Sequence, residues 1–460
     1  MKIENYEINN YRIRKFNKNN LITTDDGSWT FLNDAELAKL KKGSFDKNLM
    51  VKLKKTGVIL TKNKEEVIEN TRKRFRYLFQ GTSLHIVIPT LRCNYKCTYC
   101  HASSKDCNSK KFDMNEKTAK KAVDFIFQSP AKNIAIEFQG GEPLLNFEIL
   151  KFITEYAKKK NKEFKKEVKI ILVSNLSLLD DKKTKFLIKE NISICTSLDG
   201  PKEVHDKNRK FLSGTGSYAT TIEKIKYLNE KGIKVNALTT ITKNSLGHHK
   251  EIIDEYVSLD LNPIHIRSLD NLGYANNVWK DISYTPEEFV SFWKKSLDYI
   301  LFLNKKGIKI VERTAAIMCH KIFSVDPNFL DLRNPCGAAI GQLLYNYDGN
   351  IFTCDEGRMV DEEIFKIGDV TKKYKDVLTC PQTCAIVSAS INDTTHCDFC
   401  AYKPYCGLCP VCNYAEHGNI LAQIPATRRC KILKAQFDYI FELIQNKENK
   451  EILTTWINIV

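Results

Sequence analysis

Three cysteines lie close together in a loop that follows a short apolar segment. Cys93, Cys97 and Cys100 form a C-x3-C-x2-C run after the apolar residues 84–88. Three thiolates at this spacing can hold three irons of a [4Fe–4S] cube and leave the fourth iron without a protein ligand. An iron with an open coordination position is a place for chemistry. The alternative for the same residues is a zinc site, because C-x2-C pairs often form half of one.

A second apolar segment, 134–138, reads as a strand that ends in a glycine-rich run. This run consists of Gly140, Gly141, Glu142 and Pro143. Adjacent glycines let the backbone approach a ligand closely, and a carboxylate beside them can accept hydrogen bonds from an ammonium group. Together with the cysteine run, this pattern resembles the radical S-adenosylmethionine (SAM) superfamily, which Tyr99, the aromatic residue before the third cysteine, also fits. The resemblance implies that SAM chelates the open iron, with its methionyl ammonium at Glu142, and is cleaved to a carbon radical.

Length and cysteine content favour an enzyme of several domains. The chain has 460 residues and 16 cysteines, which predicts about two to four domains. No apolar stretch is long enough to span a bilayer, and the amino terminus has no apolar signal core. Without an export signal, so many cysteines indicate metal or cluster ligands in a reducing compartment, so we expect a cytoplasmic protein.

The formal net charge of +16 raises the question of a nucleic-acid partner. The lysines are spread along predicted helices, as at 158–160 and 165–166, where a solvated helix face explains them. No groove-reading or RNA-binding motif accompanies them. We therefore expect neither a nucleic acid nor a membrane as a partner, whereas an acidic peptide would match the charge.

Residues 1–82 contain no cysteine and form a separate predicted unit. Its β-rich segments are 11–16, 21–24 and 28–32, and its predicted helices are 35–42, 45–55 and 64–79. Three strands with three helices resemble the winged-helix-like α+β domains that recognise peptides for peptide-modifying enzymes. The alternative is a cap that packs on the core.

Residues 83–325 alternate predicted strands and helices. The strands are 84–89, 133–138, 168–174, 192–197, 234–241 and 264–268. This alternation predicts parallel strands joined by right-handed crossovers, here an α/β fold built as a partial (β/α)6 TIM-like barrel. In barrels the chemistry lies at the carboxyl ends of the strands, where the cysteine loop and the glycine-rich run both fall.

Further motifs follow the third and fourth predicted strands. Asn175 ends the third strand, and Ser197 ends the fourth, ahead of Asp199 and Arg209. By resemblance to radical enzymes that act on peptides, Ser197 binds ribose, Arg209 binds the methionyl carboxylate, and Asn175 bonds neighbouring backbone or the cofactor. Leu176 replaces the family's glycine, so we expect this loop to differ. An alternative for Asp199 and for Asp206 is that they cap turns or helices.

Residues 326–435 carry most of the remaining cysteines and resemble the SPASM extension of radical peptide maturases, which holds up to two auxiliary clusters. The resemblance groups Cys397, Cys400, Cys406 and Cys430 at a distal [4Fe–4S] cluster, and Cys336, Cys354 and Cys409 at a proximal one. The fourth proximal position is open or is filled by Cys412, Cys380 or Cys384. A zinc ribbon is the alternative, but so many cysteines exceed the ligands of one zinc site. Residues 436–460 form a predicted helix and tail.

Over nearly the whole chain, the layout is most similar to the radical maturases of His-Xaa-Ser systems, with 401–411 among the matching segments. The resemblance implies a radical SAM oxidoreductase with three [4Fe–4S] clusters that takes hydrogen from a ribosomally made precursor peptide with a leader sequence. The expected product is a side-chain crosslink, such as a cyclophane, ether or thioether, and an epimerised centre is also open. An external flavodoxin-type or ferredoxin-type protein would supply electrons.

Sulfatase-maturating enzymes are relatives with a different outcome, because they oxidise Cys or Ser to formylglycine. In these relatives an aspartate directly after a SPASM cysteine accepts a proton, and this position corresponds to Asp355. The alternative functions are therefore a Cys or Ser oxidase, a non-enzymatic electron-transfer protein with several clusters, and a zinc-dependent nucleic-acid binder. An electron-transfer protein would need neither Arg209 nor the glycine-rich run.

Overall fold

A nine-stranded mixed sheet forms the centre of the computed structural model, which describes residues 6–17, 19–324, 326–394 and 396–459. Its strand order is β13-β12-β11-β10-β9-β6-β14-β15-β16. The parallel strands are β6 (Leu84–Thr90), β9 (Asn133–Gly140), β10 (Glu167–Val173), β11 (Ser193–Ser197), β12 (Val235–Thr240), β13 (Ile264–Arg267) and β14 (Gln342–Tyr345). Two antiparallel strands, β15 (Asn350–Phe352) and β16 (Lys366–Asp369), follow β14. All six strands predicted between 83 and 325 are present, with ends that differ by at most two residues.

The sequence of β6 reflects its place in the middle of this sheet. β6 lies between β9 and β14, and its successive residues Ile86, Val87 and Ile88 are all buried. A strand that is covered on both faces is apolar at consecutive positions rather than at alternate ones. The Cys93 loop therefore follows a buried interior strand of the sheet.

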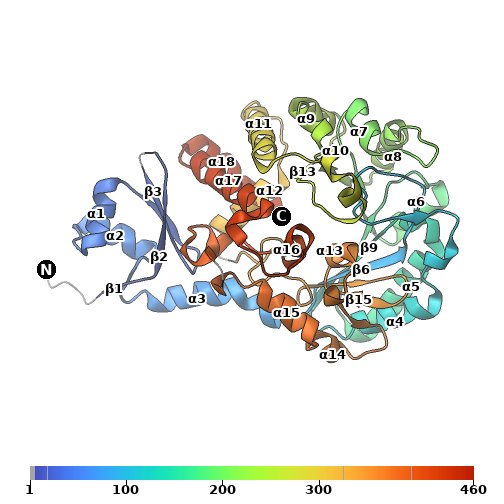
Figure 1. The fold of residues 1–460 in the computed structure, drawn as a ribbon, viewed down its shortest axis with the longest axis horizontal. Helices are drawn as coiled ribbons and strands as arrows, with labels where there is room; N and C mark the ends of the chain where they lie inside the picture. The colour runs from blue at the N-terminus through green and yellow to red at the C-terminus, as the bar shows by residue number, and fades with distance from the viewer. Residues whose placement is uncertain (1–5, 18, 325, 395, 460) are drawn as a thin grey trace.

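Helices connect the parallel strands and lie around the outside of the sheet (Figure 1). They are α4 (Glu116–Ile126), α5 (Phe147–Phe164), α6 (Asp181–Lys189), α7 (Lys202–Asn208), α8 (Tyr218–Glu230), α9 (His249–Ser258), α10 (Trp279–Ile282), α11 (Pro286–Lys305) and α12 (Arg313–Phe323). In α4 the buried residues Ala119, Ala122 and Ile126 recur every three or four positions, which gives the helix one apolar face. Its start is fixed by Asn115, whose side chain accepts the N–H of Thr118.

The N-terminal unit has its own antiparallel sheet. This sheet consists of β2 (Tyr11–Lys15), β3 (Asn20–Thr24) and β4 (Trp29–Leu32), and it is followed by α1 (Asp34–Lys42), α2 (Lys47–Lys55) and α3 (Lys64–Phe75). Gly27 has a φ of 87° in the turn between β3 and β4, where a hairpin turn needs this conformation. Two further strands, β1 (Glu7–Ile8) and β5 (Ile59–Leu60), pair with each other and are too short to show a pattern in the sequence. The winged-helix-like assignment stays a prediction.

The C-terminal part contributes β14, β15 and β16 to the main sheet, so this sheet contains strands from both sides of the predicted boundary at residue 326. Its helices are α13 (Asp355–Val360), α14 (Tyr374–Leu378), α15 (Pro381–Ala389), α16 (Pro410–His417), α17 (Arg428–Leu443) and α18 (Lys447–Thr455). α17 begins before the predicted boundary at residue 436. Within the described ranges, no helix combines the length and apolar character needed to cross a bilayer.

Candidate active site and metal centres

A cavity of 1220 Å³ joins the predicted site residues from the two halves of the chain. The sequence-predicted residues that line it are Cys93, Cys97, Tyr99, Cys100, Gly140, Gly141, Asn175, Ser197, Arg209, Cys336, Cys354, Asp355, Cys409 and Cys412. Those that do not are Glu142, Pro143, Cys397, Cys400, Cys406 and Cys430. The cysteine loop and the proximal cysteines therefore border one space, whereas the distal cysteines lie behind its wall.

Arg92 fixes the start of the cysteine loop. Its guanidinium donates two hydrogen bonds of 2.7 Å to the carboxylate of Asp113 and a third, also of 2.7 Å, to the carbonyl of Cys107. The short strand β7 (Arg92–Cys93) pairs with β8 (Lys105–Asp106) on the far side of the loop. A planar guanidinium that binds at several points holds the backbone next to Cys93 in one orientation.

The three loop cysteines are free thiols placed against the cavity. Burial raises the pKa of Cys97 to about 11, and burial followed by the charge of Cys97 raises the pKa of Cys93. Protonated thiols are poor ligands, but iron binds the thiolate and thereby compensates its charge. Three close thiols beside an open cavity fit a [4Fe–4S] cube with one iron facing the cavity.

Glycine is required at the end of β9 because the backbone there packs directly on the backbone of residues 90–92. A Cβ on Gly141 would lie 2.1 Å from the carbonyl oxygen of Arg92, and one on Gly140 would lie 2.4 Å from that of Thr90. Gly141 donates its N–H to the Thr90 carbonyl at 3.0 Å. The two glycines thus fix the cysteine loop directly, and both also line the cavity.

Glu142 is fully buried and points its carboxylate at the end of β10. It accepts hydrogen bonds of 2.8 Å from the Ser174 hydroxyl and from the N–H of Asn175, and one of 3.0 Å from the N–H of Leu144. Burial raises the pKa of Glu142. These bonds position the Asn175 loop, and the predicted contact of Glu142 with the methionyl ammonium stays a prediction.

The Asn175 loop keeps the backbone shape that glycine would give it. Leu176 has a φ of 63° and is fully buried. This left-handed conformation costs about 1–2 kcal/mol in a residue with a Cβ, and burial of the leucine side chain offsets that cost. The expected difference from the family's glycine therefore lies in the side chain and not in the fold of the loop.

Tyr99, Asp199 and Arg209 form a buried hydrogen-bonded group at the cavity wall. The Tyr99 hydroxyl donates to the Asp199 carboxylate at 2.8 Å and accepts from Arg209 Nη1 at 2.8 Å. Asp199 also accepts 3.2 Å bonds from the Asn208 amide and the Thr240 N–H. Asp199 therefore holds Tyr99, and through it Arg209, whereas α7 begins after Pro201 without a side-chain cap. Asp206 accepts the N–H of Tyr218, the first residue of α8, at 2.8 Å, as the capping alternative predicts.

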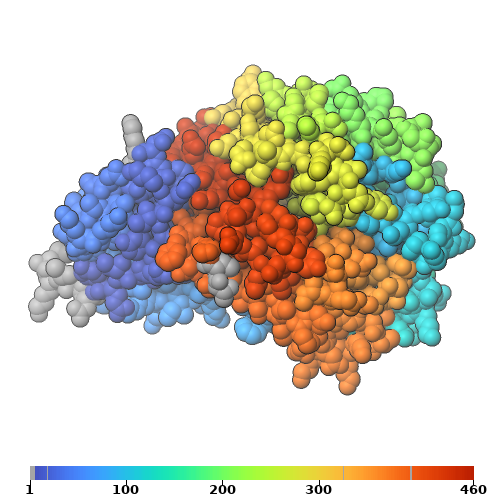
Figure 2. Space-filling view, in the orientation of Figure 1, coloured from blue at the N-terminus to red at the C-terminus, as the bar shows by residue number. Residues whose placement is uncertain are grey.

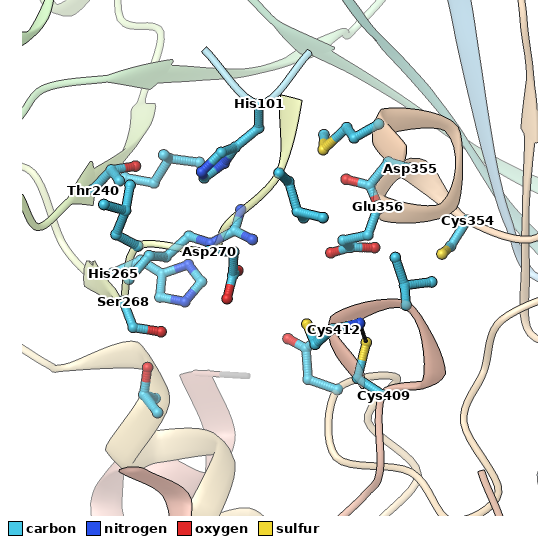
Figure 3. Close-up of a pocket in the computed structure, with 18 of the residues that line it drawn as sticks. His101, Thr240, His265, Ser268, Asp270, Cys354, Asp355, Glu356, Cys409 and Cys412 are labelled. Atoms are coloured by element: carbon cyan, nitrogen blue, oxygen red, sulfur yellow. Dashed lines mark hydrogen bonds between the residues drawn. The ribbon is translucent and has the colours of Figure 1, made fainter. Parts of the chain in front are cut away.

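The proximal cysteines come together from three segments. Cys354 begins α13 and Cys409 begins α16, and Cys336 lies on the same stretch of cavity wall. A hydrogen bond from Cys412 lowers the pKa of Cys409 to about 6. Figure 3 shows Cys409 and Cys412 side by side, facing Cys354 across a short gap.

Cys412 is the best placed of the three residues that could complete the proximal group. The thiol of Cys412 lines the cavity with the other three proximal cysteines. Cys380 and Cys384 lie at α15, outside the cavity lining, and Cys384 is exposed. The geometry therefore favours Cys412 as the fourth proximal residue.

The distal cysteines also converge. Burial and then the charges of Cys400, Cys430 and Cys397 raise the pKa of Cys406. Burial, Cys397 and Cys400 likewise raise the pKa of Cys430 to about 11. Mutual effects of this kind require short separations, so these four residues are neighbours in the fold, and their role as ligands of one distal cluster stays a prediction.

Sequence reasoning missed several polar residues of the cavity. Cys354, Asp355 and Glu356 place potential ligand atoms within 4.8 Å of one another. Burial and the charge of Asp355 raise the pKa of Glu356 well above its usual range. Figure 3 shows His101 and Asp270 across the cavity from this pair. In the sequence, His101 and Glu356 could have been recognised only because each follows a predicted cysteine ligand by one or two residues.

Comparison with known proteins supports the same interpretation. Residues 87–259 match the model of the Radical SAM superfamily. The chain is 25% identical over 367 residues to the cysteine-type anaerobic sulfatase-maturating enzyme of Clostridium perfringens, a match that covers 78% of this chain and 95% of that relative. It is 21% identical over 453 residues to the radical SAM cyclopropyl synthase TigE of Paramaledivibacter caminithermalis, covering 91% of this chain and 85% of that relative.

Two solved structures share the fold. Native anSMEcpe with bound AdoMet aligns with a TM-score of 0.70 at 20% identity, over 82% of this chain and 100% of that chain. SuiB of Streptococcus suis, bound to its precursor peptide SuiA, aligns with a TM-score of 0.55 at 16% identity, over 90% of this chain and 98% of that chain. The mixed α/β sheet with its helices is thus a fold that this chain shares with both structures. Residues 87–259 are a Radical SAM superfamily domain, and the predicted resemblance to this superfamily and to the sulfatase-maturating relatives is confirmed.

The close approach at Gly141 leads to a first prediction. Gly141→Ala should lower the free energy of unfolding of the apo-protein by about 1–3 kcal/mol, because the new methyl group meets a backbone oxygen that cannot move aside. Gly247→Ala is the matched control, since nothing lies within 4 Å of a Cβ at that position. Urea denaturation of both variants measures the difference, and equal midpoints would contradict the packing argument.

Proposed function

We propose that this chain is a radical SAM oxidoreductase that modifies a ribosomally made precursor peptide. The observation that carries the proposal is that one continuous cavity of 1220 Å³ is lined by both the loop cysteines and the proximal cysteines. This volume exceeds the roughly 300–1,000 Å³ of a pocket for one drug-sized ligand. It leaves room for SAM and for a peptide side chain between two groups of metal-ligating residues.

We assign three [4Fe–4S] clusters to the three groups of cysteines. Cys93, Cys97 and Cys100 would hold the first cluster; Cys336, Cys354, Cys409 and Cys412 the proximal one; and Cys397, Cys400, Cys406 and Cys430 the distal one. When bound, the first cluster supplies the electron that cleaves SAM to methionine and a 5′-deoxyadenosyl radical. The loop of three cysteines, with its one missing ligand, leaves a coordination position for SAM.

The remaining cavity residues would bind and orient SAM. Arg209 is held by Tyr99, so its planar fork is ready to take the methionyl carboxylate. Ser197 lies at the end of β11, where its hydroxyl can bond ribose. Asn175 is oriented by Glu142 and donates to Asn94 in the cysteine loop, which couples its loop to the first cluster site.

Asp355 is our candidate for the proton acceptor. It lines the cavity directly after Cys354 and faces the space in which a substrate would lie. After the 5′-deoxyadenosyl radical takes a hydrogen atom from the peptide, the substrate radical can couple within the peptide to form a crosslink such as a cyclophane, ether or thioether. This coupling releases one proton and one electron, and the electron would pass to an auxiliary cluster held by the C-terminal cysteines. The released proton would then pass to the Asp355 carboxylate.

A Cys or Ser oxidase of the sulfatase-maturating type is the second candidate. The match to the Clostridium perfringens enzyme over most of the chain and the position of Asp355 favour it. Mass spectrometry of the modified peptide separates the two candidates. A formylglycine product carries an aldehyde that reacts with hydrazines, whereas a crosslinked product does not.

The partners follow from this function. We propose that a leader sequence adds as an extra strand to an edge of the sheet β2-β3-β4 in the unit 1–82, as peptides do in strand-addition complexes. A flavodoxin-type or ferredoxin-type protein would provide electrons, and the reducing cytoplasm would keep the thiols available. The open edges of the main sheet, at β13 and β16, support its description as a partial (β/α)6 barrel with a C-terminal extension.

The loop cysteines give the second prediction. Replacing Cys93, Cys97 and Cys100 together by Ala should abolish reductive cleavage of SAM in anaerobically reconstituted protein, because no residue then holds the first cluster. The iron content should fall by about one cube, from roughly twelve irons to eight. Cys107→Ala and Cys384→Ala are controls outside the cavity lining. Formation of 5′-deoxyadenosine at the wild-type rate in the triple variant would make the assignment wrong.

Asp355 gives the third prediction. Asp355→Asn should slow formation of mature peptide by about 10²- to 10⁴-fold, because the near-isosteric amide cannot accept a proton. Deuterium transfer from labelled peptide into 5′-deoxyadenosine should persist. Asp361→Asn is the control, since Asp361 is an exposed residue at the end of the same helix. A normal yield of mature peptide from Asp355→Asn would remove Asp355 from the mechanism.

A further inference from the structure

The N-terminal unit packs on the chain segment that carries three of the four distal cysteines. We call residues 397–406, which contain Cys397, Cys400 and Cys406, the distal cysteine segment. Figure 2 shows the blue N-terminal unit in contact with the orange and red C-terminal part. The contacts are hydrogen bonds and ion pairs between residues more than 300 positions apart in the sequence.

Arg12 binds the turn between Cys397 and Cys400. Arg12 lies on β2 and is 4% exposed. Its Nε donates to the backbone carbonyl of Asp398, and its Nη2 donates to the Asp398 carboxylate at 3.0 Å. Because one planar fork holds both the backbone and the side chain of Asp398, it fixes the peptide group between the two cysteines.

Both the N-terminal unit and the distal cysteine segment contribute a cation and a carboxylate to this contact. Arg12 Nη1 lies 2.8 Å from Asp25 in the N-terminal unit, an ion pair without the geometry of a hydrogen bond. Lys403, which is 7% exposed, places its Nζ 2.7 Å from Asp398 and 3.8 Å from Asp25. Lys403 also pairs with Asp393, so two buried cations and three carboxylates alternate here. Removal of one member leaves an uncompensated charge, so the network favours a single arrangement.

Further contacts recur along the distal cysteine segment. The Thr23 hydroxyl donates to the carbonyl of Ala401 at 2.8 Å. Arg74 donates to the carbonyl of Pro404 at 2.6 Å, and the Tyr405 hydroxyl donates to the carbonyl of Gly27 at 3.0 Å. The segment is thus held at several points between Cys397 and Cys406 by residues of a unit that contains no cysteine.

We propose that the N-terminal unit is a structural part of the distal cluster site and that Arg12 is its main positioning residue. Arg12 and Thr23 hold Cys397 and Cys400 where they can bind one iron–sulfur cluster together with Cys406 and Cys430. This inference rests on the proposed function, which assigns those four cysteines to a cluster. A deletion of residues 1–82 would therefore remove both the predicted peptide-binding unit and the support of the distal site, and point substitutions are needed to separate the two roles.

The test compares Arg12→Gln with Lys15→Gln in the full chain. Both residues lie on β2, but Lys15 is exposed and pairs with Asp34 inside the N-terminal unit. After anaerobic reconstitution, Arg12→Gln should bind about one cube less iron than the wild type and should lose the electron paramagnetic resonance (EPR) signal that Cys430→Ala also removes. Lys15→Gln should match the wild type. In both variants the change that SAM induces in the EPR spectrum of the first cluster should persist.

Two milder variants cover the case in which Arg12→Gln fails to fold. Thr23→Val keeps the side-chain shape but loses the hydroxyl that binds Ala401, and Arg12→Lys keeps the charge but loses the fork. Both should alter the EPR spectrum of the distal cluster in a protein with wild-type circular dichroism. If both variants gave an EPR signal of the distal cluster with wild-type intensity and shape, the role of Arg12 and Thr23 would be refuted and the proposed function would stand. If the wild-type protein bound no iron, the proposed function itself would be refuted.

Discussion

The site depends on a backbone contact between the end of β9 and the strand that leads to the cysteine loop. Gly141 donates to the Thr90 carbonyl, and Glu142 donates its N–H to the Arg92 carbonyl at 2.7 Å. A side chain at Gly141 would occupy the place of this contact. From here the carboxylate of Glu142 reaches the N–H of Asn175 at the end of β10. Three strand ends are therefore joined by hydrogen bonds before any cofactor is bound, which is the preorganisation that a site for a reactive intermediate needs.

The other side of β6 joins the cysteine loop to the C-terminal part. β14 pairs with β6 in parallel, and β15 returns beside β14 and ends at Phe352, two residues before Cys354. Neighbouring strands lie about 4.8 Å apart, so the spacing between the ends of β6 and β15 is set by the sheet itself. The cavity between the two groups of cysteines thus has a width fixed by backbone hydrogen bonds rather than by flexible loops.

The sequence predicted best what depends on local patterns. The six strands predicted between residues 83 and 325 follow from apolar runs such as Ile86–Ile88. The start of α1 follows from Asn33, which forms a capping box with Glu36. The grouping of the auxiliary cysteines followed from the resemblance to a known extension. The pairing of β14 with β6 was not predicted, because these strands are far apart in sequence and β15 has only three residues. The role of Asp199 was also missed, since its partner Tyr99 lies in the cysteine loop and its partner Thr240 at the end of β12, both far from Asp199 in the sequence.

Some of the basic residues that give this chain its positive net charge are buried beside cysteines. Burial opposes the charge of Arg429, but the neighbouring Cys412 and Cys409 outweigh burial and raise its pKa. Arg209 is likewise close to Cys97, whose pKa it lowers against the effect of burial. A buried thiolate is costly without a nearby cation, and a cation there favours the deprotonated form that iron binds. Basic residues at these positions reduce the cost of gathering thiolates in one interior, so at least these two positive charges have a structural reason beside the cysteines.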